Sequence, residues 1–198
     1  MSPHRWLIFV VALASTLVLG VPMQAAPAPL AAPAAPPLVR AATGVLFVPG
    51  PAVTLPIQVT NIPQLGAATV LITYDPAVVR PTACQRNAAF NFGLCNTTHD
   101  RNGDGTADAV LFNVVSIEGI GAGETAIPLV SITWQAAAGV QPPASTDLGV
   151  QVETFTDASA NPVAVTTQGG RITIEAGSTP PQKVHLYLPV VGRYSTTP

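Results

Sequence analysis

The chain contains few charged residues. Only 9% of its 198 residues are charged and the formal net charge is -2, whereas an average soluble domain has about 25% charged residues. It has no basic patch and no run of Lys or Arg interleaved with aromatic residues, which argues against a nucleic-acid partner. It also lacks a useful stretch of helical periodicity. With 21 Pro and 16 Gly, the composition favours an all-β, turn-rich extracellular module.

The sequence lacks a hydrophobic run long enough to cross a membrane. The apolar run 6–20 follows His4 and Arg5 and is shorter than the ~20 residues that a spanning helix needs. We therefore expect residues 1–25 to be a signal peptide and the protein to be secreted or displayed at the cell surface, an uncleaved anchor being the alternative. The apolar segment 183–191, with the sequence KVHLYLPVV, is also too short to span, so the mature chain should have no membrane span.

Cysteine is scarce. The two cysteines, Cys84 and Cys95, would meet an oxidising compartment after export, so we predict one disulfide between them. A loop this short gains at most about 3 kcal/mol in the chain-entropy model. A soft-metal site is the weaker interpretation, because His99 is the only imidazole nearby.

Catalytic motifs are missing. There is no G-x-S-x-G nucleophile motif, and the acidic residues do not suggest two carboxylates facing one bond, as a glycosidase requires. We therefore expect no enzymatic activity. A strip of Trp and Tyr is also absent, which argues against binding to flat crystalline polysaccharide but leaves a single soluble glycan open. Trp134 is expected in the core, while Phe90 and Phe92 are candidate ligand contacts that could equally cover one end of the fold.

One loop has the spacing of a cation site. Asp100, Asn102 and Asp104 occupy positions 1, 3 and 5 of a calcium loop, with Gly105 at position 6, where a sharp turn is needed. Leu111 stands where an EF-hand has its bidentate Glu, and the following residues are typical of a strand, so this is not an EF-hand. We predict a structural Ca²⁺ held by Asp100, Asn102, Asp104, Thr106 and Asp108. The alternative is an ordinary Asn/Asp/Gly turn.

Short strands with turn signals between them fill the middle of the chain. Alternating apolar residues predict strands at 53–60 and 148–156, and further strands are expected at 44–48, 66–74, 109–116, 127–135, 163–167 and 171–175. This pattern predicts a single β-sandwich. We expect a signal peptide at 1–25, an Ala/Pro-rich spacer at 26–38, the sandwich at 39–176, a linker at 177–182 and a short apolar tail at 183–198. In the Tyr74-Asp75-Pro76 turn, Asp75 should cap and Tyr74 should pack.

Three segments carry motifs of a known family. They are the run 49–59, with the sequence PGPAVTLPIQV, residues 66–79 through Tyr74-Asp75-Pro76, and residues 171–174. In this order they resemble the opening strand, a strand and turn, and the closing strand of the cohesin domain. The loop 95–108 resembles an insertion in some bacterial cohesin-like modules. The resemblance covers about residues 39–176. It implies a nine-stranded, jelly-roll-like β-sandwich related to cellulose-binding modules.

The resemblance also implies a function. Cohesins bind dockerin domains of enzymes in assemblies that degrade polysaccharides, so we expect a secreted, non-catalytic module that binds a dockerin-like domain or a polysaccharide or cell-surface glycan. The family analogy places dockerin binding on an exposed sheet face. The alternative is a structural cell-envelope protein held at the surface through its C-terminal tail.

Overall fold

The computed structural model describes residues 35–123 and 125–177. The predicted signal peptide, the spacer up to residue 34, and the linker and tail from residue 178 onward lie outside the described residues. Within the described ranges, no helix has the length and apolar character needed to cross a membrane.

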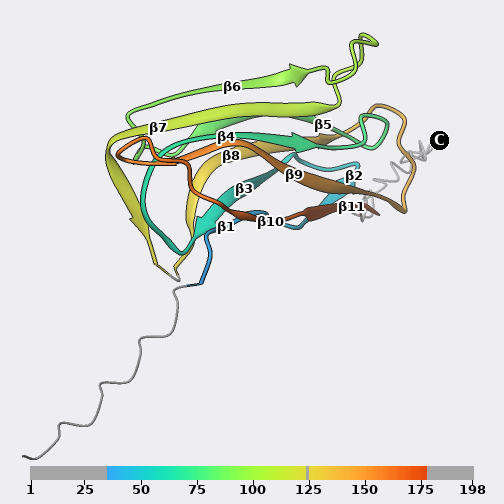
Figure 1. Cartoon of the computed structure of the whole chain (residues 1–198). Helices are drawn as coiled ribbons and strands as arrows, with labels where there is room; N and C mark the ends of the chain where they lie inside the picture. Colours follow the sequence, from blue (N-terminus) through green and yellow to red (C-terminus); the bar gives the residue numbers. More distant parts are fainter. Residues whose placement is uncertain (1–34, 124, 178–198) are drawn as a thin grey trace, which may run out of the picture. The chain divides into compact units, whose positions relative to one another are not determined.

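Eleven strands form two sheets that pack face to face as a β-sandwich (Figure 1), which confirms the predicted fold. The five-stranded sheet has the order β10-β1-β3-β8-β5, made of Thr166–Gln168, Leu38–Ala41, Val53–Thr60, Ile127–Ala136 and Val79–Arg86. The six-stranded sheet has the order β2-β11-β9-β4-β7-β6, made of Gly44–Val48, Gly170–Ala176, Ala144–Asp157, Ile62–Thr73, Ala109–Ala122 and Phe92–His99.

The eleven strands correspond to the nine expected. β1 and β2 are consecutive and are separated only by Ala42 and Thr43, but β1 pairs with β3 in one sheet and β2 with β11 in the other. β10 and β11 are likewise separated by Gly169 alone and belong to different sheets. Each pair is one extended segment that crosses from one sheet to the other. Gly170 permits this crossing, because a side chain there would collide with the carbonyl oxygen of Ala42.

The core lies between the sheets and follows the period-2 alternation of the strands. In β3, Leu55, Ile57 and Val59 are buried. Trp134 of β8 is fully buried, as predicted. The ring of Tyr74 meets it edge-on, with ring centroids 5.2 Å apart and an interplanar angle of 74°, an arrangement that aromatic pairs favour.

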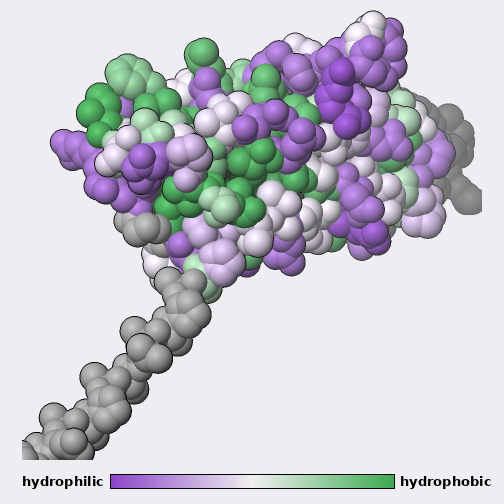
Figure 2. Space-filling view, in the orientation of Figure 1, coloured by the Kyte–Doolittle hydropathy of each residue, from purple (hydrophilic) through white to green (hydrophobic). Residues whose placement is uncertain are grey.

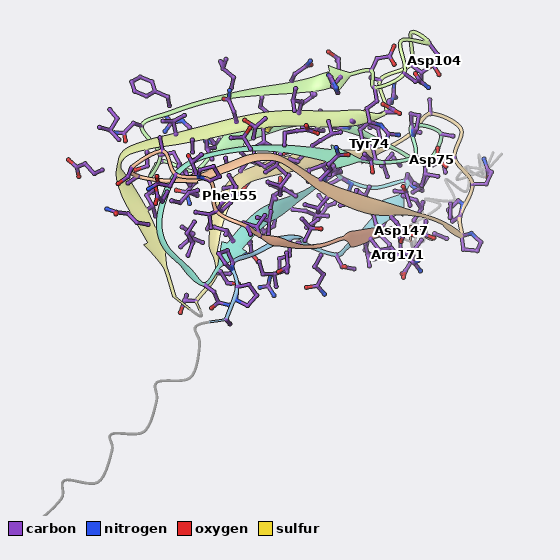
Figure 3. The ribbon with its side chains drawn as sticks, in the orientation of Figure 1. Tyr74, Asp75, Asp104, Asp147, Phe155 and Arg171 are labelled. Atoms are coloured by element: carbon purple, nitrogen blue, oxygen red, sulfur yellow. A yellow bond between two sulfur atoms is a disulfide. The ribbon has the colours of Figure 1, made fainter. Side chains whose placement is uncertain are left out.

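The Tyr74-Asp75-Pro76 turn joins β4 to β5 and has the predicted chemistry. The Asp75 side chain accepts a hydrogen bond from the backbone N–H of Ala77 at 2.9 Å, and its carbonyl accepts from Val78 and Val79. The hydroxyl of Tyr74 donates to the carbonyl oxygen of Ala107 at 3.1 Å. Figure 3 shows Tyr74 and Asp75 near the same end of the sandwich as Asp104. The turn therefore connects the core to the loop that follows β6.

Candidate functional site

The outer face of the five-stranded sheet is polar and its side chains bond to one another. The hydroxyls of Thr54 and Thr133 lie 2.9 Å apart on the neighbouring strands β3 and β8. The Arg40 guanidinium donates to the side-chain oxygen of Gln58 at 3.1 Å. In the described residues, this face carries no large exposed hydrophobic side chain.

The outer face of the six-stranded sheet is different. The large hydrophobic side chains that are exposed in the described residues all lie on this sheet, and strand alternation directs them outward. The most exposed are Phe92 and Leu94 of β6 and Ile117 of β7, at 63%, 77% and 67%, while Val45 and Phe47 lie on β2 at the opposite edge. Figure 2 shows hydrophobic surface where β6 begins. Exposed apolar residues gathered on one face mark an interaction surface.

The pairing of β6 with β7 places apolar and amide side chains next to each other. Leu94 lies opposite Asn113, and Asn96 lies opposite Leu111, so these four side chains share the outer face. They line a shallow depression of about 270 Å³ together with Thr69 of β4. The depression combines an apolar floor with amide and hydroxyl groups that can form hydrogen bonds.

Two asparagine side chains fix the backbone of this surface. The Oδ1 atom of Asn113 accepts a hydrogen bond from the backbone N–H of Leu94 at 2.8 Å. The Oδ1 atom of Asn91 accepts from the backbone N–H of Ile117, also at 2.8 Å. Both bonds hold the backbone of a residue whose apolar side chain points into solvent. The surface is therefore pre-organised, which reduces the entropic cost of binding.

The predicted disulfide is present and supports the same surface. Cys84 of β5 and Cys95 of β6 are bonded with a Cα–Cα distance of 6.2 Å. Among the described strands, β6 is an edge strand that pairs only with β7, and β5 is an edge strand of the other sheet. The disulfide thus ties the strand that carries Phe92 and Leu94 across the sandwich to the second sheet.

The two candidate ligand contacts, Phe90 and Phe92, lie in different environments. Phe90 is 1% exposed and belongs to the core, so the prediction that it could contact a ligand at the surface is wrong. Its backbone N–H donates to the carbonyl of Asn87 in the turn between β5 and β6, and this turn directs the ring inward. Phe92 remains an exposed candidate. The structure adds Leu94, Asn113 and Ile117 to it, which the sequence interpretation had missed.

The acidic loop has a network of its own. Asp100 accepts hydrogen bonds from the backbone N–H groups of Asn102, Gly103 and Gly105, at 3.2, 2.8 and 2.7 Å. These bonds, the one from Gly105 foremost, lower the pKa of Asp100 because they stabilise its ionised form. Gly103 and Gly105 have φ angles of 74° and 87°, a conformation that glycine adopts without strain. Figure 3 shows Asp104 at the tip of this loop.

Asp108 lies apart from this network and has a cationic partner. Its carboxylate accepts two hydrogen bonds from the Arg101 guanidinium, at 3.0 and 2.7 Å. The bond to Arg101 lowers the pKa of Asp108. No group of three or more His, Cys, Asp or Glu side chains in the described part of the chain is arranged to hold a metal ion. Turn chemistry and an ion pair therefore account for these carboxylates, and the calcium site remains a prediction.

Comparisons with known proteins identify the family from the sequence and the fold from the structure. The family model for the cohesin domain matches residues 42–174. Among solved structures, a non-cellulosomal cohesin from Archaeoglobus fulgidus is 16% identical, with a TM-score of 0.56 over 72% of this chain and 93% of the other. The seventh ScaB type I cohesin from Pseudobacteroides cellulosolvens is 17% identical, with a TM-score of 0.57 over 76% and 97% of the two chains.

A type I cohesin–dockerin complex from Clostridium thermocellum also has this fold. The matched chain is 15% identical, with a TM-score of 0.55 over 71% of this chain and 99% of the other. At these identities, the structural likeness establishes the fold alone. No curated protein sequence matches the chain.

Proposed function

Because the chain belongs to the cohesin domain family, we propose that it is a non-catalytic binding module whose partner is a dockerin domain. The observation that carries the proposal is the outer face of β6, β7 and β4, where Phe92 and Leu94 are exposed beside a depression lined by amide and hydroxyl groups. The similar structure from Clostridium thermocellum is a complex of a cohesin with a dockerin.

The composition of this face suits a protein partner. Protein interfaces have an apolar centre with a polar rim, and a few large side chains supply most of the binding energy. Leu94 and Phe92 would form the apolar centre, and Asn96, Asn113 and Thr69 would supply hydrogen bonds around it. A rigid sheet held by a disulfide needs little rearrangement when it binds. The outer face of the other sheet has no comparable group of exposed apolar side chains in the described residues.

The proposal is tested with a matched pair of substitutions. Leu94→Asp places a charge on the exposed face of β6 next to Cys95, and Gln85→Asp places the same charge on exposed β5 next to Cys84. Both positions lie on edge strands and both neighbour the same disulfide, so both variants should fold alike. Binding to a panel of type I dockerin domains is measured by calorimetry. Leu94→Asp should weaken binding at least tenfold, or about 1.4 kcal/mol, and Gln85→Asp should leave it unchanged.

Two results would contradict the proposal. Failure of the parent protein to bind any dockerin in the panel at millimolar concentration would remove the partner class. Equal weakening by Leu94→Asp and Gln85→Asp would place the binding surface elsewhere on the sandwich.

We further propose that the module acts outside the cell. The predicted signal peptide at 1–25 supports export, and the disulfide suits an oxidising compartment. The measurement is the amount of protein in the medium or on the cell surface for the parent and for a chain lacking residues 2–25. Equal export of both would refute the assignment of that segment.

A further inference from the structure

The sandwich has an open seam along one side of β9. In the described part of the chain, β11 pairs with β9 only as far as Leu148, and no strand pairs with the same edge from Gly149 to Thr154. The segment 162–167 approaches β9 at one point, where the backbone N–H of Val163 donates to the carbonyl of Phe155 at 2.9 Å. It then leads into β10 of the other sheet.

The seam is a groove with an apolar floor. It has a volume of about 840 Å³ and lies between residues 150–156 of β9 and the segment 162–167. Val150 and Val152 are half-buried there and pack against the core from one side, and Val163 and Val165 do so from the other. Figure 2 shows hydrophobic surface in the middle of the visible face, where Figure 1 places β9 and β10.

An open strand edge beside an apolar groove can accept a further strand. Unpaired backbone groups on such an edge bond an extended peptide, and alternate side chains of the peptide enter the groove. Native proteins cover edges of this kind, because an exposed edge promotes aggregation.

The geometry points to an occupant within the same chain, and we propose that the segment 183–191 docks into this groove as an added strand. Its sequence, KVHLYLPVV, alternates in the manner of a strand with one buried face. Val184, Leu186 and Leu188 fall on one side, and Lys183, His185 and Tyr187 fall on the other. Pro189 follows the apolar positions, and an edge strand tolerates a proline.

The point where the sandwich ends sets the reach and direction of this segment. Gly177 donates to the carbonyl of Val48 at 3.0 Å, at the end of β11 far from the groove. From Gly177, the chain has to run back along β11 and then along residues 149–155. Each of these two stretches is about 23 Å long, at about 3.3 Å per residue. The fifteen residues 177–191 span about 50 Å when extended. The segment would therefore enter beside Leu148 and run parallel to β9.

The register matches at the apolar positions. Along β9, Val150, Val152 and Phe155 face the core, and the pairing of β9 with β4 shifts by one residue between Val152 and Thr154. These three inward-facing residues of β9 can therefore lie beside the three apolar residues on one side of the segment, which are Val184, Leu186 and Leu188. Glu153 is the only charged residue that lines the groove, and the segment carries Lys183 and no acidic residue.

Hydrogen–deuterium exchange of the chain without its signal peptide tests the proposal. Leu186→Asp with Leu188→Asp charges the side predicted to enter the groove. The matched control, His185→Asp with Tyr187→Asp, charges the opposite side of the same strand. The first pair should raise amide exchange in residues 149–156 by about tenfold or more, because edge amides lose their partners. The control should leave this exchange unchanged, and β4 and β7 should exchange alike in all three proteins.

Each remaining result would overturn the proposal. If neither pair of substitutions changes amide exchange in residues 149–156, or if both pairs change it equally, the segment does not bind with Leu186 and Leu188 facing the groove. Loss of protection at Gly44–Val48 instead would place the segment on the free edge of β2. Protection that disappears on dilution would show that a second copy fills the groove. None of these variants alters Phe92 or Leu94, so the outcome is independent of dockerin binding.

Discussion

Removing the disulfide should lower stability globally and loosen β6 in particular. Cys84 and Cys95 are eleven residues apart, and a closed loop of this size contributes about 3 kcal/mol in the chain-entropy model. For a domain of this length, 1 kcal/mol corresponds to about 3 °C in Tm. Cys84→Ala with Cys95→Ala should therefore lower Tm by about 10 °C, as measured by calorimetry under non-reducing conditions.

The position of the disulfide adds a local consequence. The bond joins edge strands of the two sheets, and β7 is the only strand that pairs with β6 within residues 35–123 and 125–177. Amide exchange in β6 should consequently rise more in the double variant than exchange in β4, which lies between β9 and β7. A fall in Tm of less than about 3 °C would refute the entropic estimate. An equal rise in β6 and β4 would mean that the bond acts through the unfolded chain alone.

Two further predictions concern the core and the acidic loop. Trp134→Ala should cost about 3–5 kcal/mol in urea unfolding. Trp134→Phe should cost less than about 2 kcal/mol, because it also removes a buried indole N–H that has no hydrogen-bond partner among the described residues. If the loop binds calcium, Asp104→Ala should lower Tm in calcium and hardly in chelator. Asp108→Ala also breaks the ion pair with Arg101, so it should lower Tm in chelator as well, and by a larger amount in calcium. Ligand linkage sets the gain for the parent at about 2.7 kcal/mol at a hundred times the dissociation constant, and an equal loss for Asp104→Ala in the two buffers would refute the calcium site.

Strands with a regular alternation could be predicted from the sequence. The bounds of β2 and β3 agree with the expectation, β8 is one residue longer at its C-terminal end, and β11 is one residue longer at each end. In β3, apolar residues alternate with the others over the whole strand, so the sequence alone identifies which face is buried. β4 begins earlier than predicted, because residues 62–65 continue the ladder through bulges that interrupt the alternation. β9 begins at Ala144, because residues 144–147, which were not predicted as part of the strand, pair with β11 in regular register.

The strands β1, β5 and β6 were not predicted. β1 has four residues, too few to establish a period. β5 contains Pro81, which argues against a central strand, but β5 is an edge strand and an edge tolerates proline. The sequence between the cysteines was therefore interpreted as a loop, although it joins two strands in different sheets. Only tertiary pairing shows that Phe90 turns inward there.

β6 was missed for a reason that bears on function. Its alternation is reversed, because Phe92 and Leu94 point outward while Gly93 and Cys95 point toward the other sheet. A larger residue at position 93 would collide with the side chain of Arg86 and the carbonyl of Asn113, so the inner side of β6 must be small. A pattern search for buried apolar residues cannot identify such a strand.

This reversal is what the proposed binding role of β6 would require. Exposed apolar side chains on an edge strand contribute little to folding and favour aggregation, so the strand has to be held by other means. Asn113 bonds its backbone from the neighbouring strand, and Cys95 binds it covalently to the opposite sheet. Residues that violate the local rules of a fold are expected where function demands them. In β6 the exposed Phe92 and Leu94 lie next to Cys95, and Asn113 holds the same stretch from β7. This proximity is the strongest physical argument for the binding face that we propose.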